Sequence, residues 1–249
     1  MIYPVIFSIG SSSIHAHLVC EILAYSLGYR YYAYLRRHTV DPISESDRLW
    51  IFIGAAFGGF LGGHLVGIVE RPDDWAKGLD WLYFMGNKTI LGGLLGGLIG
   101  VEFTKKQIGV TASSGDLMTY PLIVGMVIGR IGCHLEGLED GTYGLPTTLP
   151  WAMDFGDGIW RHPVNLYEIL FLTALGVGLR WLERKHPLSM GSRFRLFMVG
   201  YLSWRFVLEY IKPAYFWSFG LSSIQVTVLM GLLYYRDVFF TPKKLFDRT

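Results

Sequence analysis

The chain has 249 residues, of which 51% are hydrophobic and 17% are charged, and its formal net charge is +2. Its mean hydropathy is +0.36. Because soluble domains carry roughly 25% charged residues, this composition indicates an integral membrane protein and excludes an ordinary soluble enzyme.

Seven apolar segments predict an all-α polytopic integral membrane protein with about seven transmembrane helices, since roughly 20 apolar residues are needed to cross a bilayer. The predicted helices lie near residues 14–34, 49–69, 89–104, 115–133, 163–183, 195–211 and 219–236. We expect residues 1–249 to form a single transmembrane domain, with an ordered extracytoplasmic loop near residues 134–162.

Charged residues are distributed unequally between the connections. One set of connections is basic and contains Arg36, Arg37, Arg48, Lys105, Lys106, Arg184, Lys185, Arg193 and the tail residues Lys243, Lys244 and Arg248. The other set is acidic or mixed and contains Glu70, Asp73, Asp74, Asp80, Glu136, Glu139, Asp140, Asp154 and Asp157. The positive-inside rule therefore predicts an amino terminus outside and a carboxyl terminus in the cytoplasm.

The segment from Met1 to Ser13 has neither a basic start nor a small-residue cleavage site, so we expect the first helix to be retained. Cys20 and Cys133 lack metal-ligand spacing and are expected to be free thiols. His15, His17 and Glu21 on the first helix could each be a buried hydrogen-bond partner. A metal site built from these three residues is disfavoured, because residues two apart do not share a helix face.

Glycines recur at four-residue spacing in the second and third predicted helices, at Gly54, Gly58, Gly62, Gly92, Gly96 and Gly100 among others. Small residues at this spacing let helix backbones approach closely in a membrane. A flexible gate around a lipid cavity is the alternative interpretation.

Arg130 follows directly on apolar sequence long enough to enter a bilayer. An arginine at such a depth is costly, and it usually faces a wet cavity and pairs with an anion. In a membrane the most abundant anion is a lipid phosphate. We therefore predict that Arg130 binds a phosphate group.

Arg205 and Glu209 are four residues apart in the sixth predicted helix and are expected to form an ion pair on one helix face. A structural salt bridge alone would explain this pair. Arg130 and Arg205 together are harder to explain, since one carboxylate neutralises only one charge. We therefore predict an anionic ligand between the two arginines.

Glycines and prolines predict a turn-rich loop after the fourth helix, with Trp151 and Trp160 at the membrane interface. The loop ends in the segment Arg161–Glu168, where we expect a helix to begin at Pro163. His162, Tyr167 and Glu168 are able to transfer or hold protons. The alternative is a helix cap with an interfacial tyrosine. Arg161 is expected to contact headgroups and loop carboxylates.

Six blocks of sequence resemble the prolipoprotein diacylglyceryl transferase family in order and spacing. They are Gly129-Arg-Ile-Gly132, Gly141-Thr-Tyr-Gly144, Leu149-Pro-Trp151, Arg161-His-Pro-Val-Asn-Leu-Tyr-Glu168, Arg205-Phe-Val-Leu-Glu209 and Leu221-Ser-Ser-Ile-Gln225. Phe7-Ser-Ile-Gly10 with Ile14-His15 resembles the family's opening, so the resemblance covers nearly the whole chain. It implies a multi-pass enzyme of the bacterial inner membrane. Such an enzyme transfers the diacylglyceryl group of phosphatidylglycerol to the lipobox cysteine of prolipoproteins and releases glycerol phosphate.

The resemblance also implies residue roles. Arg130 falls on the family's signature arginine, Arg205 on its sixth-helix arginine and Glu209 on the partner acid; Gly141 matches the distal glycine of the signature and His15 a histidine on the first helix. We predict catalytic roles for Arg130, Arg205, Glu209 and His162. We predict substrate binding by Arg130, His15, His17, Glu136, Gly141, Tyr167 and Glu168.

The chain also departs from the family's pattern. Leu95 replaces a histidine before Gly96-Gly97, Cys133 replaces an asparagine, Leu138 with Glu139 replaces an acid, and His17 aligns with a tyrosine. Leucine cannot move a proton, so the base for the acceptor thiol is left open between His17, His15, His162 and Glu136, or the acceptor differs. Cys133 is interpreted as a packing residue, with a covalent lipid intermediate as the alternative.

Three functions are compatible with these residues. The first is the transferase, the second a paralogous lipid transferase with another acceptor, and the third a non-enzymatic phospholipid-binding or transport protein. The expected partners are phosphatidylglycerol, a prolipoprotein lipobox peptide and membrane lipids. We expect no nucleic acid, metal or cofactor, since the sequence has neither a phosphate-cradling loop nor a ligand cluster.

Overall fold

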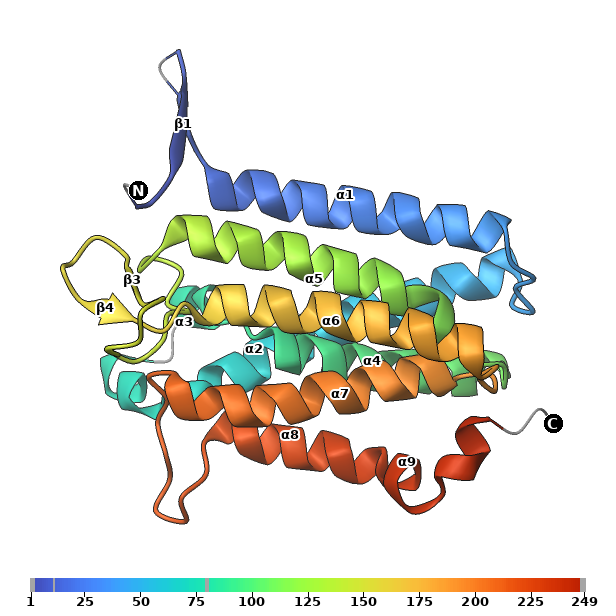
Figure 1. Cartoon of the computed structure of the whole chain (residues 1–249). Helices are drawn as coiled ribbons and strands as arrows, with labels where there is room; N and C mark the ends of the chain where they lie inside the picture. Colours follow the sequence, from blue (N-terminus) through green and yellow to red (C-terminus); the bar gives the residue numbers. More distant parts are fainter. Residues whose placement is uncertain (1–2, 11, 79–80, 247–249) are drawn as a thin grey trace. The chain divides into compact units, whose positions relative to one another are not determined.

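The computed structural model describes residues 3–10, 12–78 and 81–246, and most of them are helical (Figure 1). The chain forms two compact units. The first unit comprises Met1–Val40, Gly115–Pro213 and Thr241–Thr249, and the second comprises Asp41–Ser114 and Ala214–Phe240. Every candidate site residue named above belongs to the first unit.

The first unit is a helical bundle centred on α5. Its long helices are α1 (Ala16–Arg37), α5 (Asp116–Glu136), α6 (Val164–Lys185) and α7 (Ser192–Leu208), and α7 continues into the 3-10 helix η2 (Glu209–Ile211). α5 packs against α1, α6 and α7 (Figure 1). Its short elements are the hairpin β1 (Ile6–Ile9) and β2 (Ser12–His15), the pair β3 (Met153–Asp154) and β4 (Trp160–Arg161), and η3 (Pro242–Leu245).

The second unit is built around two long helices, α2 (Glu45–Glu70) and α4 (Ile90–Ile108), which pack against each other and against α8 (Ser223–Tyr234). Its shorter elements are η1 (Pro72–Lys77), α3 (Trp81–Gly86) and α9 (Arg236–Phe240). Both α2 and α8 begin at side-chain caps. Ser44 accepts a hydrogen bond from the backbone N–H of Asp47, and Ser222 forms a capping box with Gln225.

The helical class predicted from the sequence is confirmed, and each of the seven predicted segments overlaps one of the helices α1, α2, α4, α5, α6, α7 and α8. Among the described residues, α2 and α5 are long and apolar enough to cross a membrane, and α8 is a shorter apolar helix. α5 continues three residues beyond the predicted helix end at Cys133, to Glu136, and is followed by Gly137, whose φ is +72°. The number of membrane crossings, the orientation and the single domain stay predictions.

The predicted close packing of the glycine-rich helices is confirmed. A Cβ atom added at Gly62 of α2 would lie 2.5 Å from the carbonyl oxygen of Gly92 and 2.7 Å from Cα of Gly96, both on α4. Real Cβ atoms do not approach backbone atoms so closely. The two helices therefore touch backbone to backbone, and only glycine fits at the contact.

We expect Gly62→Ala to destabilise the protein by about 1–3 kcal/mol, since overpacking at a rigid backbone contact forces the helices apart. Gly63→Ala is the matched control on the same helix. Its added Cβ would meet the carbonyl oxygen of Thr89 at an ordinary 3.5 Å. Thermal unfolding of the two variants in detergent tests the contact, and equal melting temperatures would contradict it.

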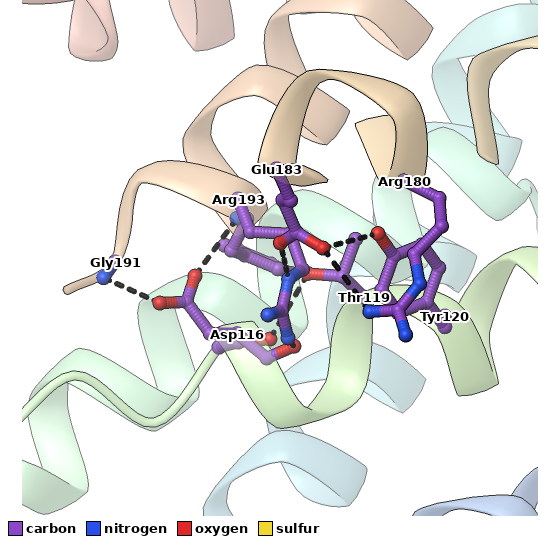
Figure 2. A network of polar contacts seen from close by, with 9 residues as sticks. Asp116, Thr119, Tyr120, Arg180, Glu183, Gly191 and Arg193 are labelled. Atoms are coloured by element: carbon purple, nitrogen blue, oxygen red, sulfur yellow. Dashed lines mark hydrogen bonds and ion pairs between the residues drawn. The ribbon is translucent and has the colours of Figure 1, made fainter. Parts of the chain in front are cut away.

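A polar network joins one end of the first unit's helices (Figure 2). The carboxylate of Asp116, in the first turn of α5, accepts hydrogen bonds from the backbone N–H groups of Gly191 (2.6 Å) and Phe194 (3.0 Å) at the start of α7. Glu183 of α6 forms an ion pair with Arg193 of α7 and accepts a hydrogen bond from the hydroxyl of Tyr120 of α5. The network thus fixes the ends of α5, α6 and α7 relative to one another.

The same network borders a cavity of about 290 Å³, lined by Asp116, Arg180, Glu183, Leu188, Ser189, Met190 and Arg193. Its two carboxylates are already bonded to helix N–H groups or to Arg193. Arg130 lies 14 residues further along α5 than Asp116, which corresponds to about 21 Å of helix. The cavity is therefore separate from the candidate site.

Candidate functional site

Arg130 of α5 is buried, with 5% of its surface exposed. Its Nε atom lies 3.0 Å from Oε2 of Glu168 on α6, and its Nη1 atom faces the sulfur of Cys133 at 3.8 Å. A buried guanidinium needs a negative partner, because an unpaired charge in the interior is strongly destabilising. Glu168 is that partner.

Glu168 also connects Arg130 to α7. Its Oε2 atom lies 3.7 Å from Nη1 of Arg205, and its Oε1 atom accepts a hydrogen bond of 2.7 Å from the hydroxyl of Tyr201. Arg205 in turn lies 3.6 Å from Glu209, which confirms the predicted ion pair. We call Arg130, Glu168, Tyr201, Arg205 and Glu209 the arginine cluster.

Two carboxylates, rather than the single one predicted, compensate the two arginines. Glu168 supplies a second carboxylate and pairs with both guanidinium groups. In the sequence Glu168 directly follows Tyr167 and lies six residues after His162. Consecutive residues of a helix point about 100° apart, so Glu168 faces the bundle interior while Tyr167 faces the loop.

Further charged side chains lie close to the arginine cluster. Lys212, which is also buried, interacts electrostatically with Glu168. Asp140 interacts with Arg130 from the loop, where it is also close to His17. The three cations Arg130, Arg205 and Lys212 therefore face the three carboxylates Glu168, Glu209 and Asp140. A phosphodiester that binds here takes over guanidinium donors from these carboxylates.

His162 lies beside Tyr167 at the start of α6, with Nδ1 of His162 3.3 Å from the hydroxyl oxygen of Tyr167. That oxygen accepts a hydrogen bond of 2.7 Å from Nε1 of Trp151 in the loop. Pro163 is the N-cap rather than the first helical residue. The three predicted proton-transfer residues thus divide into a His162–Tyr167 pair in contact with the loop and a separate, buried Glu168.

The end of α5 and the start of α1 are joined by two histidine–carboxylate pairs. Nδ1 of His15 lies 2.6 Å from Oε1 of Glu136, and Nδ1 of His17 lies 3.7 Å from Oδ1 of Asp140. The turn that carries Asp140 closes with a hydrogen bond from the N–H of Gly141 to the carbonyl of Leu138. Gly141 has φ of +68°, which L side chains rarely adopt, so its role here is to form the turn.

The loop before α6 is held by Arg161. Its guanidinium donates two hydrogen bonds, of 2.6 and 2.7 Å, to the carboxylate of Asp157, which lowers the pKa of Asp157 below its usual range. The guanidinium also lies over the ring of Tyr143, 5.3 Å from its centroid. The prediction that Arg161 contacts a loop carboxylate is confirmed, and Arg161 stays outside the arginine cluster.

Two residues at the site were missed from the sequence. Tyr201 lies four residues before Arg205, so the helical spacing that identified Glu209 could also have identified it. No helical spacing identifies Asp140, because it reaches His17 from a turn. In the sequence it is one of several acidic residues of the same connection. His17, Cys133 and Asp140 each place one possible metal-ligand atom within 4.8 Å of the others.

Comparison with known proteins places the chain among membrane enzymes of bacteria. Residues 4–236 match the family model described as prolipoprotein diacylglyceryl transferase. Proteins named phosphatidylglycerol--prolipoprotein diacylglyceryl transferase are similar to it along most of its length. The one from Bordetella bronchiseptica is 30% identical over 84% of this chain and 82% of its own, and that from Vibrio vulnificus is 32% identical over 84% and 78%. The one from Wolbachia pipientis wMel is 30% identical over 93% of each chain.

Proposed function

The chain belongs to the prolipoprotein diacylglyceryl transferase family, and we propose that its arginine cluster binds the phosphate of the lipid donor. The enzyme transfers the diacylglyceryl group of phosphatidylglycerol to the lipobox cysteine thiol of prolipoproteins, the first step of lipoprotein maturation. Glycerol phosphate is the second product. Phosphatidylglycerol and the prolipoprotein are its two substrates.

The observation that carries the assignment is the pair of buried arginines around Glu168. A guanidinium can hold two phosphate oxygens at once, which a point charge cannot. We assign Arg130 and Arg205 as the groups that bind the phosphate. When the lipid enters, its phosphate takes over part of the charge compensation that Glu168 provides in its absence. Glu209 keeps Arg205 in place during this exchange.

The reaction is a substitution at carbon. The acceptor sulfur, as a thiolate, attacks the glyceryl carbon that bears the phosphate oxygen, because a thiol is a poor nucleophile. The new S–C bond forms while the C–O bond breaks, and the electron pair of the C–O bond stays on glycerol phosphate. Negative charge therefore grows on the phosphate oxygens, where Arg130 and Arg205 stabilise it in a site shielded from water.

The remaining site residues form two groups at different places in the first unit. His162 and Tyr167, which contact Trp151 of the loop, are assigned to proton transfer and to binding on the loop side. His15, His17, Glu136 and Gly141 are assigned to substrate binding where α1 meets the end of α5. Leu95 lies on α4 and is apolar, so the proton of the acceptor thiol must be removed elsewhere.

We place the enzyme in the bacterial inner membrane as a single multi-pass domain. Seven helices cross the bilayer, the amino terminus is outside and the carboxyl terminus is in the cytoplasm. The alternation of basic and acidic connections supports this orientation, and the apolar lengths of α2 and α5 support the crossings. The loop near residues 134–162 then lies outside, where secreted prolipoproteins arrive.

The proposed function is tested with the purified protein, phosphatidylglycerol vesicles and a synthetic lipobox peptide. Mass spectrometry should find a diacylglyceryl thioether on the peptide cysteine, with an equal amount of glycerol phosphate released. A peptide with serine in place of the cysteine should stop both products. Lipid turnover with membrane extracts but not with the peptide would point to another acceptor. Headgroup-dependent binding without any product would indicate a carrier.

A further inference from the structure

Three side chains of different chemistry converge beside the arginine cluster. They are the imidazole of His17 near the start of α1, the thiol of Cys133 in the last turn of α5 and the carboxylate of Asp140 in the turn that follows. One ligand atom of each lies within 4.8 Å of the others, and Cys133 is buried. Ligand atoms around a tetrahedral Zn²⁺ ion, with bonds of about 2.0–2.3 Å, lie roughly 3.3–3.8 Å apart. The 3.7 Å between His17 Nδ1 and Asp140 Oδ1 falls in that range.

Two of these side chains have a neighbour on the atom that faces away from the group. Nε2 of His17 lies 3.9 Å from Oε1 of Glu21, one helical turn further along α1, which is within ion-pair distance but too far for a hydrogen bond. Oδ2 of Asp140 accepts a hydrogen bond from the hydroxyl of Thr142, so Oδ1 is the atom that faces His17. Ligating histidines and carboxylates usually have such second partners, which fix their orientation and raise their basicity.

The sulfur of Cys133 has two polar neighbours. Nη1 of Arg130 faces it at 3.8 Å, and the carboxylate of Asp140 forms a side-chain hydrogen bond with the thiol. Thiolate, imidazole and carboxylate together select Zn²⁺ over Mg²⁺ or Ca²⁺, which prefer oxygen ligands alone. The sequence spacing did not predict this group because its members lie on three separate segments.

A second group, His15, Glu136 and Glu139, has similar distances but a simpler explanation. Nδ1 of His15 is already bonded to Glu136 at 2.6 Å, and Glu139 is exposed. A hydrogen bond between histidine and glutamate accounts for that pair. It also lacks a thiol, and its possible ligands are one imidazole and two carboxylates.

We propose that His17, Cys133 and Asp140 bind one Zn²⁺ ion whose fourth position accepts the thiol of the incoming lipobox cysteine. Three protein ligands with an open position are typical of catalytic zinc sites. Binding of Zn²⁺ by the three residues does not depend on the proposed function. Coordination of the lipobox thiol at the fourth position rests on it. The ion also brings positive charge next to Asp140, which interacts electrostatically with Arg130.

The zinc site would supply the thiolate for which no base has been assigned. A thiol that coordinates Zn²⁺ gives up its proton, here to a water molecule displaced from the fourth position and then to bulk solvent. The metal-bound sulfur then forms the S–C bond, the C–O bond to phosphate breaks, and glycerol phosphate leaves with the electron pair. No oxidation or reduction takes place. Because Cys133 contacts Arg130, the acceptor thiol would lie beside the guanidinium that holds the phosphate.

Metal binding is tested with Co²⁺ on the purified full-length protein, after removal of any affinity tag and of bound metal with a chelator. Co²⁺ coordinated by a thiolate in a tetrahedral site has a charge-transfer absorption in the near ultraviolet. We expect this band to saturate at about one equivalent per chain and to disappear when Zn²⁺ is added. Absence of the band would overturn the proposal.

The two cysteines provide a matched pair of variants. Both are free and buried, but Cys20 lies outside the group. Cys133→Ser should abolish the thiolate band, whereas Cys20→Ser should retain it. Asp140→Asn keeps the sulfur ligand and should weaken Co²⁺ binding by about 10-fold or more. Loss of the band in Cys20→Ser with retention in Cys133→Ser would overturn the assignment, as would unchanged affinity in Asp140→Asn.

The role in thiol activation is tested separately by the peptide assay with stripped and zinc-loaded enzyme. We expect transfer to fall by at least 10-fold on stripping and to return with Zn²⁺. Full transfer by verified metal-free enzyme would overturn thiol activation and leave the proposed function intact. Metal binding without transfer in either form would overturn the proposed function and leave the zinc site intact.

Discussion

Replacing Arg130 with lysine is expected to lower the turnover of phosphatidylglycerol by about 100-fold or more, since losing one positioned donor to a developing anion typically has that effect. Lysine keeps the charge but offers a single point of contact. The guanidinium of Arg130 must reach Glu168 on one side and a phosphate on another, which requires its planar fork of donors. Release of glycerol phosphate in the peptide assay measures the effect.

The control for Arg130→Lys is Arg180→Lys. The side chain of Arg180 is 62% exposed and lies 3.7 Å from Glu183 in the network at the other end of α6. Exposed ion pairs contribute little, so this variant should retain near-normal turnover. A melting temperature measured for both proteins separates lost chemistry from lost folding. Turnover close to wild type in Arg130→Lys would rule out the role of Arg130 as a phosphate ligand.

The helices were predictable because their signals are local. Apolar length located the segments that became α1, α2, α4, α5, α6, α7 and α8, and glycine spacing predicted the backbone contact between Gly62 and Gly96. These features depend on residues a few positions apart. The ends were less certain, as at Glu136, where a helix continued until a glycine with positive φ ended it.

The candidate site was predictable only in part, because its contacts join distant segments. The spacing of four residues was enough to predict the Arg205–Glu209 pair. The partner of Arg130 is Glu168, which lies 38 positions away and was interpreted with its sequence neighbours instead. Asp140 lies in a turn and reaches His17 through the geometry of that turn. Such contacts depend on how the helices pack, which no local pattern specifies.

Glu168→Gln tests the charge balance of the arginine cluster. The substitution keeps the size of the side chain and an oxygen that can accept from Tyr201, but it removes the negative charge shared by Arg130 and Arg205. Breaking a buried ion pair on one side typically costs about 3–5 kcal/mol, because the remaining charge is buried without compensation. In lipid-free detergent we therefore expect the Glu168→Gln protein to have a lower melting temperature than the wild type, because its buried arginines lack part of their charge compensation.

Phosphatidylglycerol should restore much of that loss. A ligand that binds only the folded state stabilises it, and in the Glu168→Gln protein the lipid phosphate supplies the negative charge that the variant lacks. The lipid should therefore raise the melting temperature of the variant more than that of the wild type. Diacylglycerol has the same chains without the phosphate and should have no such differential effect. Glu102→Gln is the control, since that side chain is 47% exposed and forms an ion pair with Lys105 across one helical turn. Equal stabilisation of variant and wild type by phosphatidylglycerol would mean that the phosphate does not bind at the arginine cluster.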